Sequence, residues 1–408
     1  MKQPELIPHL FRTEFRKITA VLCKLFGIAH IEIAEDIASE TFLRAIETWP
    51  YKGVPENPTA WLYTVAKNKA KNYIHRDQVF TGKIAGEIRH TLSGIEEIEI
   101  DLSEQNITDS QLQMLFAICH PSISTEAQIG LALRILCGFG IDEIANALLT
   151  NKETINKRLF RAKDKLRTEK VKIEFPGAAE INKRLETVLT TLYLLFNEGY
   201  YSESRDTVLR EDLCLEAMRL TYLLIENEHT CKPVVYALLA LMCFQSSRFE
   251  ARKNANREMI LYQDQDETLW NQELISKGMY FLNVSAQGDK ISKYHLEASI
   301  AYWHTIKEDT HEKWENILQL FNQLLQIEYS PIAALNRTYA LSKSNGKAAA
   351  IIEAEKLGLT DNHFYFTLLG ELYKGTDDDK ARKNFQTAFS LAKTQTDKQT
   401  IQKKIDKL

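Results

Sequence analysis

The densest positive charge in the chain follows a short polar break near residue 150. Residues 152–172 include nine basic and three acidic residues, a net charge of +6. Apolar residues recur at 155, 159, 162 and 166, the spacing of one helix face, so cations cover the remaining surface of this helix. Arginine and asparagine can hydrogen-bond base edges, and lysine neutralises phosphate. These residue types indicate contact with a polyanion such as DNA.

The pattern before this basic helix suggests how it could be presented. Residues 141–149 form a short amphipathic segment, residues 150–152 a polar break, and residues 153–167 the longer basic helix. A short helix, a tight turn and a longer basic helix make the plan of a helix-turn-helix, whose second helix enters the major groove. An ordinary helical hairpin with a solvated basic face is the alternative.

A second polar stripe occurs in residues 58–77, after a loop indicated by Gly53, Pro55 and Pro58. The stripe recurs at i, i+3, i+4 and i+7 and consists of Asn68, Lys71, Asn72 and His75, flanked by Lys67 and Arg76. The aromatic residues Trp61, Tyr63 and Tyr73 lie nearby. Cations that hold a backbone and aromatic faces that receive unstacked bases are what single-stranded DNA requires. A solvated amphipathic helix is the competing interpretation.

A third segment, residues 34–47, has an acidic face. Its inward positions are Ala34, Ile37, Ala38, Thr41 and Ala45, and the residues expected to point outward are Glu32, Glu35, Asp36, Glu40 and Glu47. An acidic face cannot bind phosphate, so it favours a protein partner with complementary basic charge. A solvated face again remains the alternative.

The elements that position these residues all read as helices. Prolines and glycines are scarce, at 9 and 16 of 408 residues, and no alternating strand pattern occurs. We therefore expect an all-α chain with helical modules at residues 1–80 and 108–170. Residues 81–107, with a net charge of −4 and three glycines, predict a linker. Residues 171–408 form a larger helical extension.

The C-terminal part of the extension contains a repeat. Leu369, Gly370 and Tyr373, followed by Ala381 and Phe385, resemble a tetratricopeptide repeat. A similar pattern occurs thirty-four residues earlier, at Leu335, Asn336 and Tyr339, and a weaker copy lies around Tyr302 and Trp314. Stacked helix pairs from about residue 295 are therefore predicted, and a generic helical bundle is the alternative.

Other classes of protein find little support in the sequence. The first residues lack the apolar run of a signal peptide, and no apolar stretch approaches the length of a membrane span, so we expect a cytoplasmic protein. The six cysteines have no metal-binding spacing. Glu198 has no partner for catalysis, and His295, Glu297 and His304 do not share one helical face. No catalytic residue, metal or cofactor is therefore predicted.

The three segments occur together in a specific order. AEDIASETF, PTAWLYTVAKNKAKNYIHR and DEIANALLTNKETINKRLFRAKDKLR resemble the sigma-70 family, in particular its extracytoplasmic-function sigma factors, over residues 8–170. LFAICHP, LYLLFNEGY and SPIAALNRTYAL resemble the subgroup with a tetratricopeptide-like C-terminal extension. The resemblance implies two sigma-type helical domains, regions 2 and 4, followed by a helical-repeat domain that regulates them.

The resemblance also assigns roles to residues, with core RNA polymerase, through its beta-prime clamp and beta flap, and promoter DNA as partners. The candidates for binding core polymerase are Glu35, Asp36, Glu40, Thr41, Phe42 and Arg44. Those for the −10 element are Trp61, Asn68, Lys69, Lys71, Asn72, His75 and Arg76. Those for the −35 element are Lys152, Thr154, Asn156, Lys157, Arg158 and Arg161.

Two other functions remain open from the residues alone. One is a helix-turn-helix regulator that binds duplex DNA without being a polymerase subunit. The other is a repeat scaffold that binds proteins only, with an incidental basic helix. A helix-turn-helix regulator leaves the acidic face of residues 34–47 unexplained, and a protein-binding scaffold leaves the two basic stripes unexplained.

Overall fold

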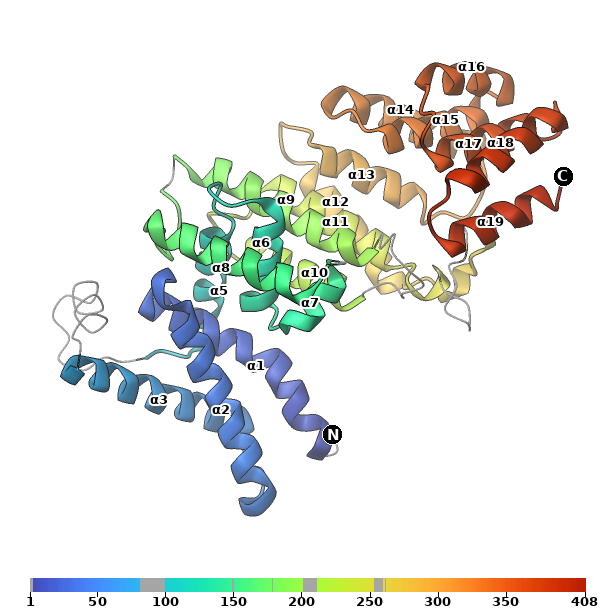
Figure 1. Cartoon of the computed structure of the whole chain (residues 1–408). Helices are drawn as coiled ribbons and strands as arrows, with labels where there is room; N and C mark the ends of the chain where they lie inside the picture. Colours follow the sequence, from blue (N-terminus) through green and yellow to red (C-terminus); the bar gives the residue numbers. More distant parts are fainter. Residues whose placement is uncertain are drawn as a thin grey trace. The chain divides into compact units, whose positions relative to one another are not determined.

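The structure, a computed structural model, describes residues 3–80, 100–148, 150–177, 179–200, 211–252, 260 and 262–408. Every regular element in these ranges is a helix, which confirms the predicted all-α fold (Figure 1). The chain divides into two compact units, Met1–Leu195 and Phe196–Leu408. The first unit therefore holds both expected N-terminal modules together with most of the helix that follows them. None of the described helices is long and apolar enough to cross a membrane.

Three long helices open the first unit: α1 (Gln3–Phe26), α2 (Ile31–Lys52) and α3 (Pro58–Phe80). Helix α1 packs against both α2 and α3. Its Phe15 ring lies 6.4 Å from that of Phe42 on α2, and Phe11 lies 5.1 Å from Phe42, so an aromatic cluster joins the two helices. Gly53 ends α2 with a φ of 82°, a conformation that glycine adopts without steric cost.

The predicted linker is only partly within the described residues. Residues 81–99 lie outside them. Ile100 and Leu102 are buried, and a helix already begins at Glu104, so the last residues of the expected linker belong to the folded unit. Ser103 caps this helix by accepting a hydrogen bond from the Asn106 backbone N–H at 3.4 Å.

The second half of the first unit contains the predicted short and long helices. Its elements are α5 (Glu104–Ile118), α6 (Thr125–Leu131), a π-helical turn η2 (Ala132–Leu136), α7 (Ile141–Ala147) and α8 (Lys152–Thr168). The predicted inward stripe of α8 is confirmed, because its buried residues are Ile155, Leu159, Ala162 and Leu166. Helix α9 (Ile181–Tyr200) spans the division between the two units.

The second unit is also helical throughout the described residues. Its helices are α10 (Glu211–Ile225), α11 (Pro233–Ser246), α12 (Gln272–Ser285), α13 (Lys293–Trp303), α14 (His311–Ile327), α15 (Pro331–Ser344), α16 (Lys347–Leu357), α17 (His363–Tyr373), α18 (Asp378–Leu391) and α19 (Gln395–Ile405). The 3₁₀ turns η3 (Glu250–Arg252), η4 (Tyr262–Asp264) and η5 (Glu267–Leu269) lie between α11 and α12.

The helices from α13 onward bury their apolar faces in successive small cores. One core joins α13, α14 and α15, the next joins α15, α16 and α17, and a third joins α18 and α19. Each segment therefore contacts mainly its neighbours in the sequence, which is the organisation of a helical solenoid. At the better repeat, a Cβ on Gly370 would lie 2.6 Å from the Phe385 ring, so α17 and α18 pack closely.

Candidate nucleic-acid and protein interfaces

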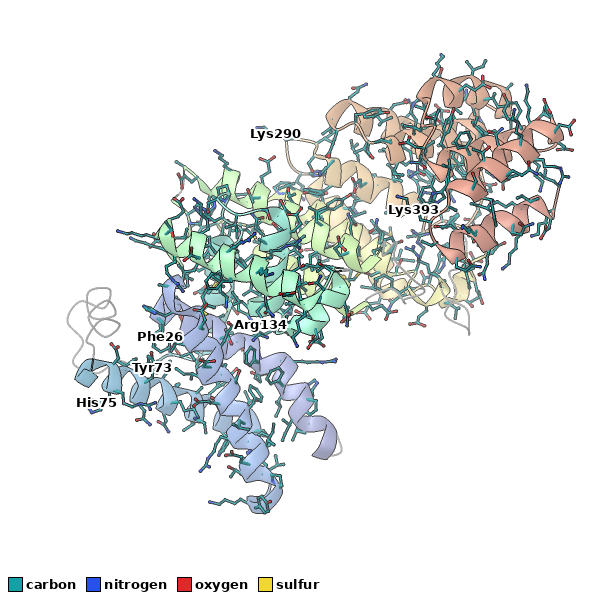
Figure 2. All side chains as sticks on the ribbon, in the orientation of Figure 1. Phe26, Tyr73, His75, Arg134, Lys290 and Lys393 are labelled. Carbon is teal, nitrogen blue, oxygen red and sulfur yellow. The ribbon has the colours of Figure 1, made fainter. Side chains whose placement is uncertain are left out.

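Helix α3 presents the polar stripe that the sequence predicts. Leu62, Ala66 and Ala70 are buried against the rest of the unit, which fixes the orientation of the helix. The side chains left exposed on its other faces include Asn68, Lys71, Asn72, His75 and Arg76. Figure 2 labels His75 near the end of this helix. The exposed side chains offer hydrogen-bonding groups and positive charge along one helix, as binding to a nucleic-acid strand requires.

The aromatic residues around this stripe are only partly available. Trp61 packs edge-on against Trp49 of α2, with ring centroids 5.4 Å apart. Tyr63 donates a hydrogen bond from its hydroxyl to Glu14 at 2.6 Å, and burial together with this bond raises the pKa of Tyr63. Tyr73 lies edge-on to Phe26, with centroids 5.9 Å apart. Trp61, the one aromatic residue of this group in the predicted −10 set, is half-buried, as are Tyr63 and Tyr73.

The N-terminal half of α8 exposes most of the third predicted set. Asn151 caps the helix by accepting a hydrogen bond from the Thr154 backbone N–H at 2.8 Å. Lys152, Asn156, Lys157 and Arg161 are exposed, and Thr154 and Arg158 are half-buried. Lys152 pairs with Asp142 of α7 at 3.0 Å, an exposed ion pair that links the two helices. The two-helix arrangement leaves polar and basic groups exposed on the outer face of the longer helix, where Lys157 also pairs with Glu153 at 3.3 Å.

Helix α2 presents a smaller acidic surface than the sequence predicts. Asp36, Glu40 and Arg44 are exposed. Thr41 is buried, and its hydroxyl donates to the Ile37 carbonyl at 2.8 Å. Phe42 is buried in the aromatic cluster with α1, so in this structure neither of these two residues offers a contact surface. Glu40 forms an ion pair with Lys69 of α3 at 2.6 Å, so a residue of the predicted polymerase-binding set contacts a residue of the predicted −10 set.

The prediction that Glu35 points to solvent was wrong. Its side chain is 9% exposed and lies between two cations from the second half of the unit. Arg134 Nε donates to one carboxylate oxygen at 2.6 Å, and Lys163 Nζ donates to the other at 2.8 Å. The carboxylate is therefore buried with a hydrogen-bonded cation on each oxygen, the condition under which a buried charge is tolerated.

Helix α8 contacts α2 through further charges near the same point. Lys163 also lies 3.5 Å from Glu32, and Arg167 lies 3.6 Å from Glu32. Arg167 donates to the Ala29 carbonyl at 3.1 Å. We call this set (Glu32, Glu35, Arg134, Lys163 and Arg167) the α2–α8 charge cluster. It places the C-terminal half of the predicted recognition helix on the helix predicted to bind polymerase.

Sequence reasoning missed the cationic members of this cluster. Lys163 follows the buried Ala162, at the border of the inward stripe, which indicates a partly covered position. No local signal identifies its partner, because Glu35 lies 128 residues away in the sequence. Arg134 is 99 residues from Glu35 and lies in a π-helical turn that periodicity does not predict.

The other titratable residues noted in the sequence have structural surroundings. Glu198 lies in the last turn of α9, where partial burial raises the pKa of its carboxyl group. The two ring nitrogens of His295 lie 2.8 Å from the Ser292 hydroxyl and 3.3 Å from the Ser285 carbonyl. Among the described residues no group of three histidine, cysteine or acidic side chains could hold a metal ion.

Comparisons with known proteins match two parts of the chain. Residues 10–79, which contain α2 and most of α1 and α3, match sigma-70 region 2. Residues 184–286 match a family of unknown function, DUF6596. An uncharacterized protein of Rhizobium meliloti (strain 1021) is 32% identical over 387 residues, which cover 93% of this chain and 90% of that protein. No solved structure matches the chain significantly.

Proposed function

We propose that the chain is a sigma factor of the sigma-70 family, which binds core RNA polymerase and directs it to specific promoters; the match of residues 10–79 to sigma-70 region 2 supports this proposal. One observation carries the proposal: the part that matches sigma-70 region 2 contains the helix whose exposed face is polar and basic. Sigma factors act in transcription initiation, where this surface would hold the −10 element. We assign that contact to Trp61, Asn68, Lys69, Lys71, Asn72, His75 and Arg76.

Residues 108–170 would form region 4, and its helices α7 and α8 would hold the −35 element. Support comes from the capped N-terminus of α8 and from the exposed Asn156, Lys157 and Arg161 behind it. An α-helix fits the major groove, and arginine or asparagine there can distinguish bases. Lys152, Thr154 and Arg158 complete the set we assign to this element.

The exposed acidic residues of α2 would contact the beta-prime clamp of the polymerase. Asp36, Glu40 and Arg44 are exposed, whereas Glu35 is enclosed by Arg134 and Lys163. Polymerase binding at Glu35 would therefore require α8 to leave α2. We infer that the free chain has a closed first unit and that this unit opens when it joins the polymerase.

The mechanism involves no change of covalent bonds. A sigma factor lowers the cost of opening the promoter because it binds unstacked bases better than duplex. Unstacking costs a few kcal/mol per step, and stacking on an aromatic ring recovers ~1–3 kcal/mol per base. The half-buried ring of Trp61 would contribute such a contact.

The extension would regulate the two sigma modules. We assign the chain to the extracytoplasmic-function subgroup with a tetratricopeptide-like extension, supported by the successive helix cores from α13 onward. A promoter reporter that responds to the full chain should change its output when the chain ends at residue 195, the limit of the first unit. An unchanged output under all growth conditions would contradict a regulatory role.

Transcription with purified core polymerase tests the main proposal. The full chain is added to core polymerase on fragmented genomic DNA, and the 5′ ends of the transcripts are sequenced. We expect new start sites that share upstream sequence elements, and Asn72→Ala or Arg161→Ala should reduce their use. A helix-turn-helix regulator would instead bind duplex DNA in a gel shift without polymerase. The absence of chain-dependent starts would overturn the proposal.

A further inference from the structure

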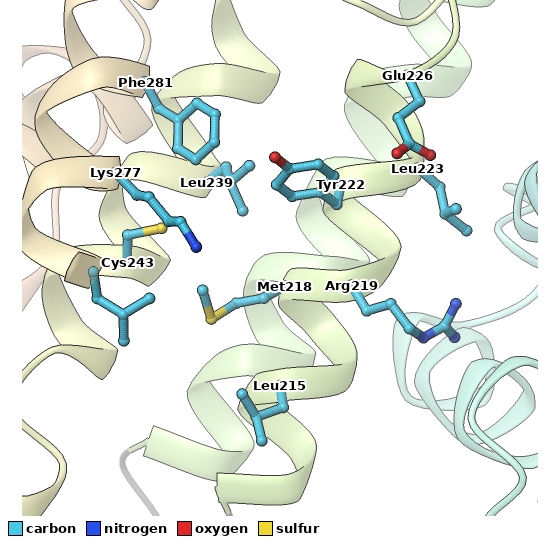
Figure 3. Close-up of a pocket in the computed structure, with 11 residues that line it drawn as sticks. Leu215, Met218, Arg219, Tyr222, Leu223, Glu226, Leu239, Cys243, Lys277 and Phe281 are labelled. Carbon is cyan, nitrogen blue, oxygen red and sulfur yellow. The ribbon is translucent and has the colours of Figure 1, made fainter. Parts of the chain in front are cut away.

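The second unit contains an open cavity with two similar walls. It has a volume of about 360 Å³ and lies within the part that matches the DUF6596 family (Figure 3). Helix α10 forms one wall and α12 the other, and α11, which packs against both, supplies Leu239 and Cys243 to the lining. This lining is mainly apolar, as in binding sites generally.

The two walls carry side chains at the same helical spacing. Leu215, Met218 and Tyr222 line the cavity from α10 at positions i, i+3 and i+7. Leu274, Lys277 and Phe281 line it from α12 at the same intervals. The Tyr222 and Phe281 rings meet edge-on, with centroids 6.0 Å apart, so the last positions of the two stripes face each other. The cavity is therefore a groove between two matched helix stripes.

The groove is exposed along the α10 wall. Leu215 is 59% exposed and Tyr222 is 45% exposed, so two large apolar side chains on one stripe of this helix are open to solvent. Seven residues of helix span ~10 Å, or about two turns, so the groove matches the length of a short helical stripe. A partner helix that presents apolar side chains at i, i+3 or i+4 and i+7 would insert them between the walls.

The charges at the groove indicate what should flank that stripe. The two cations of the lining are already neutralised: Arg219 pairs with Glu216 at 2.8 Å, and Lys277 pairs with Glu273 at 2.6 Å. Glu226, one turn beyond Tyr222, also lines the cavity, and it forms no ion pair with a lysine or arginine of the described residues. A complementary partner would supply a basic residue at this end of the groove.

We propose that the α10–α12 groove binds an amphipathic helix of a partner protein, with an apolar stripe between the walls and a basic residue beside Glu226. The groove then serves as a protein-docking site of the extension. This inference does not depend on the proposed function, because it rests on residues of the second unit alone.

Selection from a displayed peptide library tests the proposal with the full chain as target. The library consists of helical peptides of about 18 residues, or five turns, with apolar residues fixed on one stripe and lysine or glutamate varied beside it. We expect peptides with a basic residue at one end of the stripe to be enriched. Leu215→Glu and Tyr222→Glu should each weaken their binding by about tenfold or more.

Two further variants make the test specific. Met279→Glu replaces a residue of α12 that is 41% exposed and is absent from the cavity lining, so it should leave peptide binding unchanged. Glu226→Lys should reverse the selection toward peptides with an acidic residue at the same end. The proposal is overturned if no peptide is sensitive to Leu215→Glu or Tyr222→Glu, or if Glu226→Lys leaves the charge preference unchanged. Concentration-dependent self-association abolished by Tyr222→Glu would also overturn it, in favour of a second copy of the chain.

Discussion

Replacing Lys163 with methionine should make the chain bind core polymerase more tightly. The substitution keeps most of the side-chain volume and removes the charge that holds one oxygen of Glu35 at 2.8 Å. Lys163 is not among the residues assigned to polymerase or DNA, so its loss removes no proposed contact. If the closed first unit competes with polymerase, weakening the α2–α8 charge cluster should increase the fraction that is ready to bind.

The size of the effect follows from the geometry. At 2.8 Å the attraction between the two charges is ~6 kcal/mol for an effective dielectric constant of about 20, but desolvation opposes most of it. Arg134 still neutralises Glu35 in the variant, so the loss should be that of one charged hydrogen bond, ~2 kcal/mol. A change of ~2 kcal/mol corresponds to an increase in polymerase affinity of about 30-fold.

Two measurements on the full chain decide the matter. Polymerase affinity is measured by fluorescence anisotropy, and amide hydrogen exchange reports whether α8 becomes less protected. Lys165→Met is the matched control, because Lys165 pairs with Glu169, the residue that follows the same helix, at 2.7 Å. Faster exchange at α8 without tighter polymerase binding in Lys163→Met would refute the reasoning that the contact blocks polymerase.

Three further predictions concern other parts of the chain. Lys71→Ala should weaken binding of the polymerase complex to forked promoter DNA. The slope of log affinity against log salt concentration should fall by about one phosphate contact, and an unchanged slope would contradict a contact between Lys71 and the DNA backbone. Gly370→Val should lower the stability of the second unit by ~1–3 kcal/mol, because a Cβ there meets the Phe385 ring at 2.6 Å; unchanged urea unfolding would contradict the close packing. His304 lies between Tyr262 and Trp314, and burial with Arg248 and Lys313 nearby lowers its pKa to about 3. In the unfolded chain His304 has its ordinary pKa, so the unfolded chain is protonated at a higher pH than the folded chain. The free energy of unfolding should therefore fall by ~2 kcal/mol from pH 7.5 to 5, and His304→Gln should flatten that pH dependence in thermal unfolding.

In the first unit, the sequence predicts the orientation of a helix wherever that orientation depends only on the helix's own apolar face. Ile155, Leu159, Ala162 and Leu166 recur at helical spacing, and burying that stripe leaves only one orientation for α8. The exposed stripe of α3 follows in the same way from its buried Leu62. Local periodicity is sufficient here because it decides which side faces the core.

The placement of Glu35 was beyond the reach of the same reasoning. Periodicity assigns charged residues to the solvent side, since burying an unpaired carboxylate is costly. That cost is offset by Arg134 and Lys163, and their approach depends on how α8 and the η2 turn pack on α2. The groove of the second unit was missed for a related reason. Tyr222 and Phe281 lie on α10 and α12, with α11 between them in the sequence, so local periodicity does not predict that their rings meet.

The position of the α2–α8 charge cluster along α8 predicts which activity the closed unit restrains. Lys163 and Arg167 lie in the C-terminal half of the helix, whereas Asn156 and Lys157 are exposed before them. Asn156 precedes Lys163 by seven residues, or ~10 Å along the axis, so the contact with α2 leaves the proposed base-reading end uncovered. Lys163→Met should therefore strengthen polymerase binding while leaving the weak binding of the free chain to −35 duplex nearly unchanged. If duplex binding rose by the same factor as polymerase binding, the closed unit would restrain DNA contact too, and the separation of the two surfaces argued from α8 would be wrong.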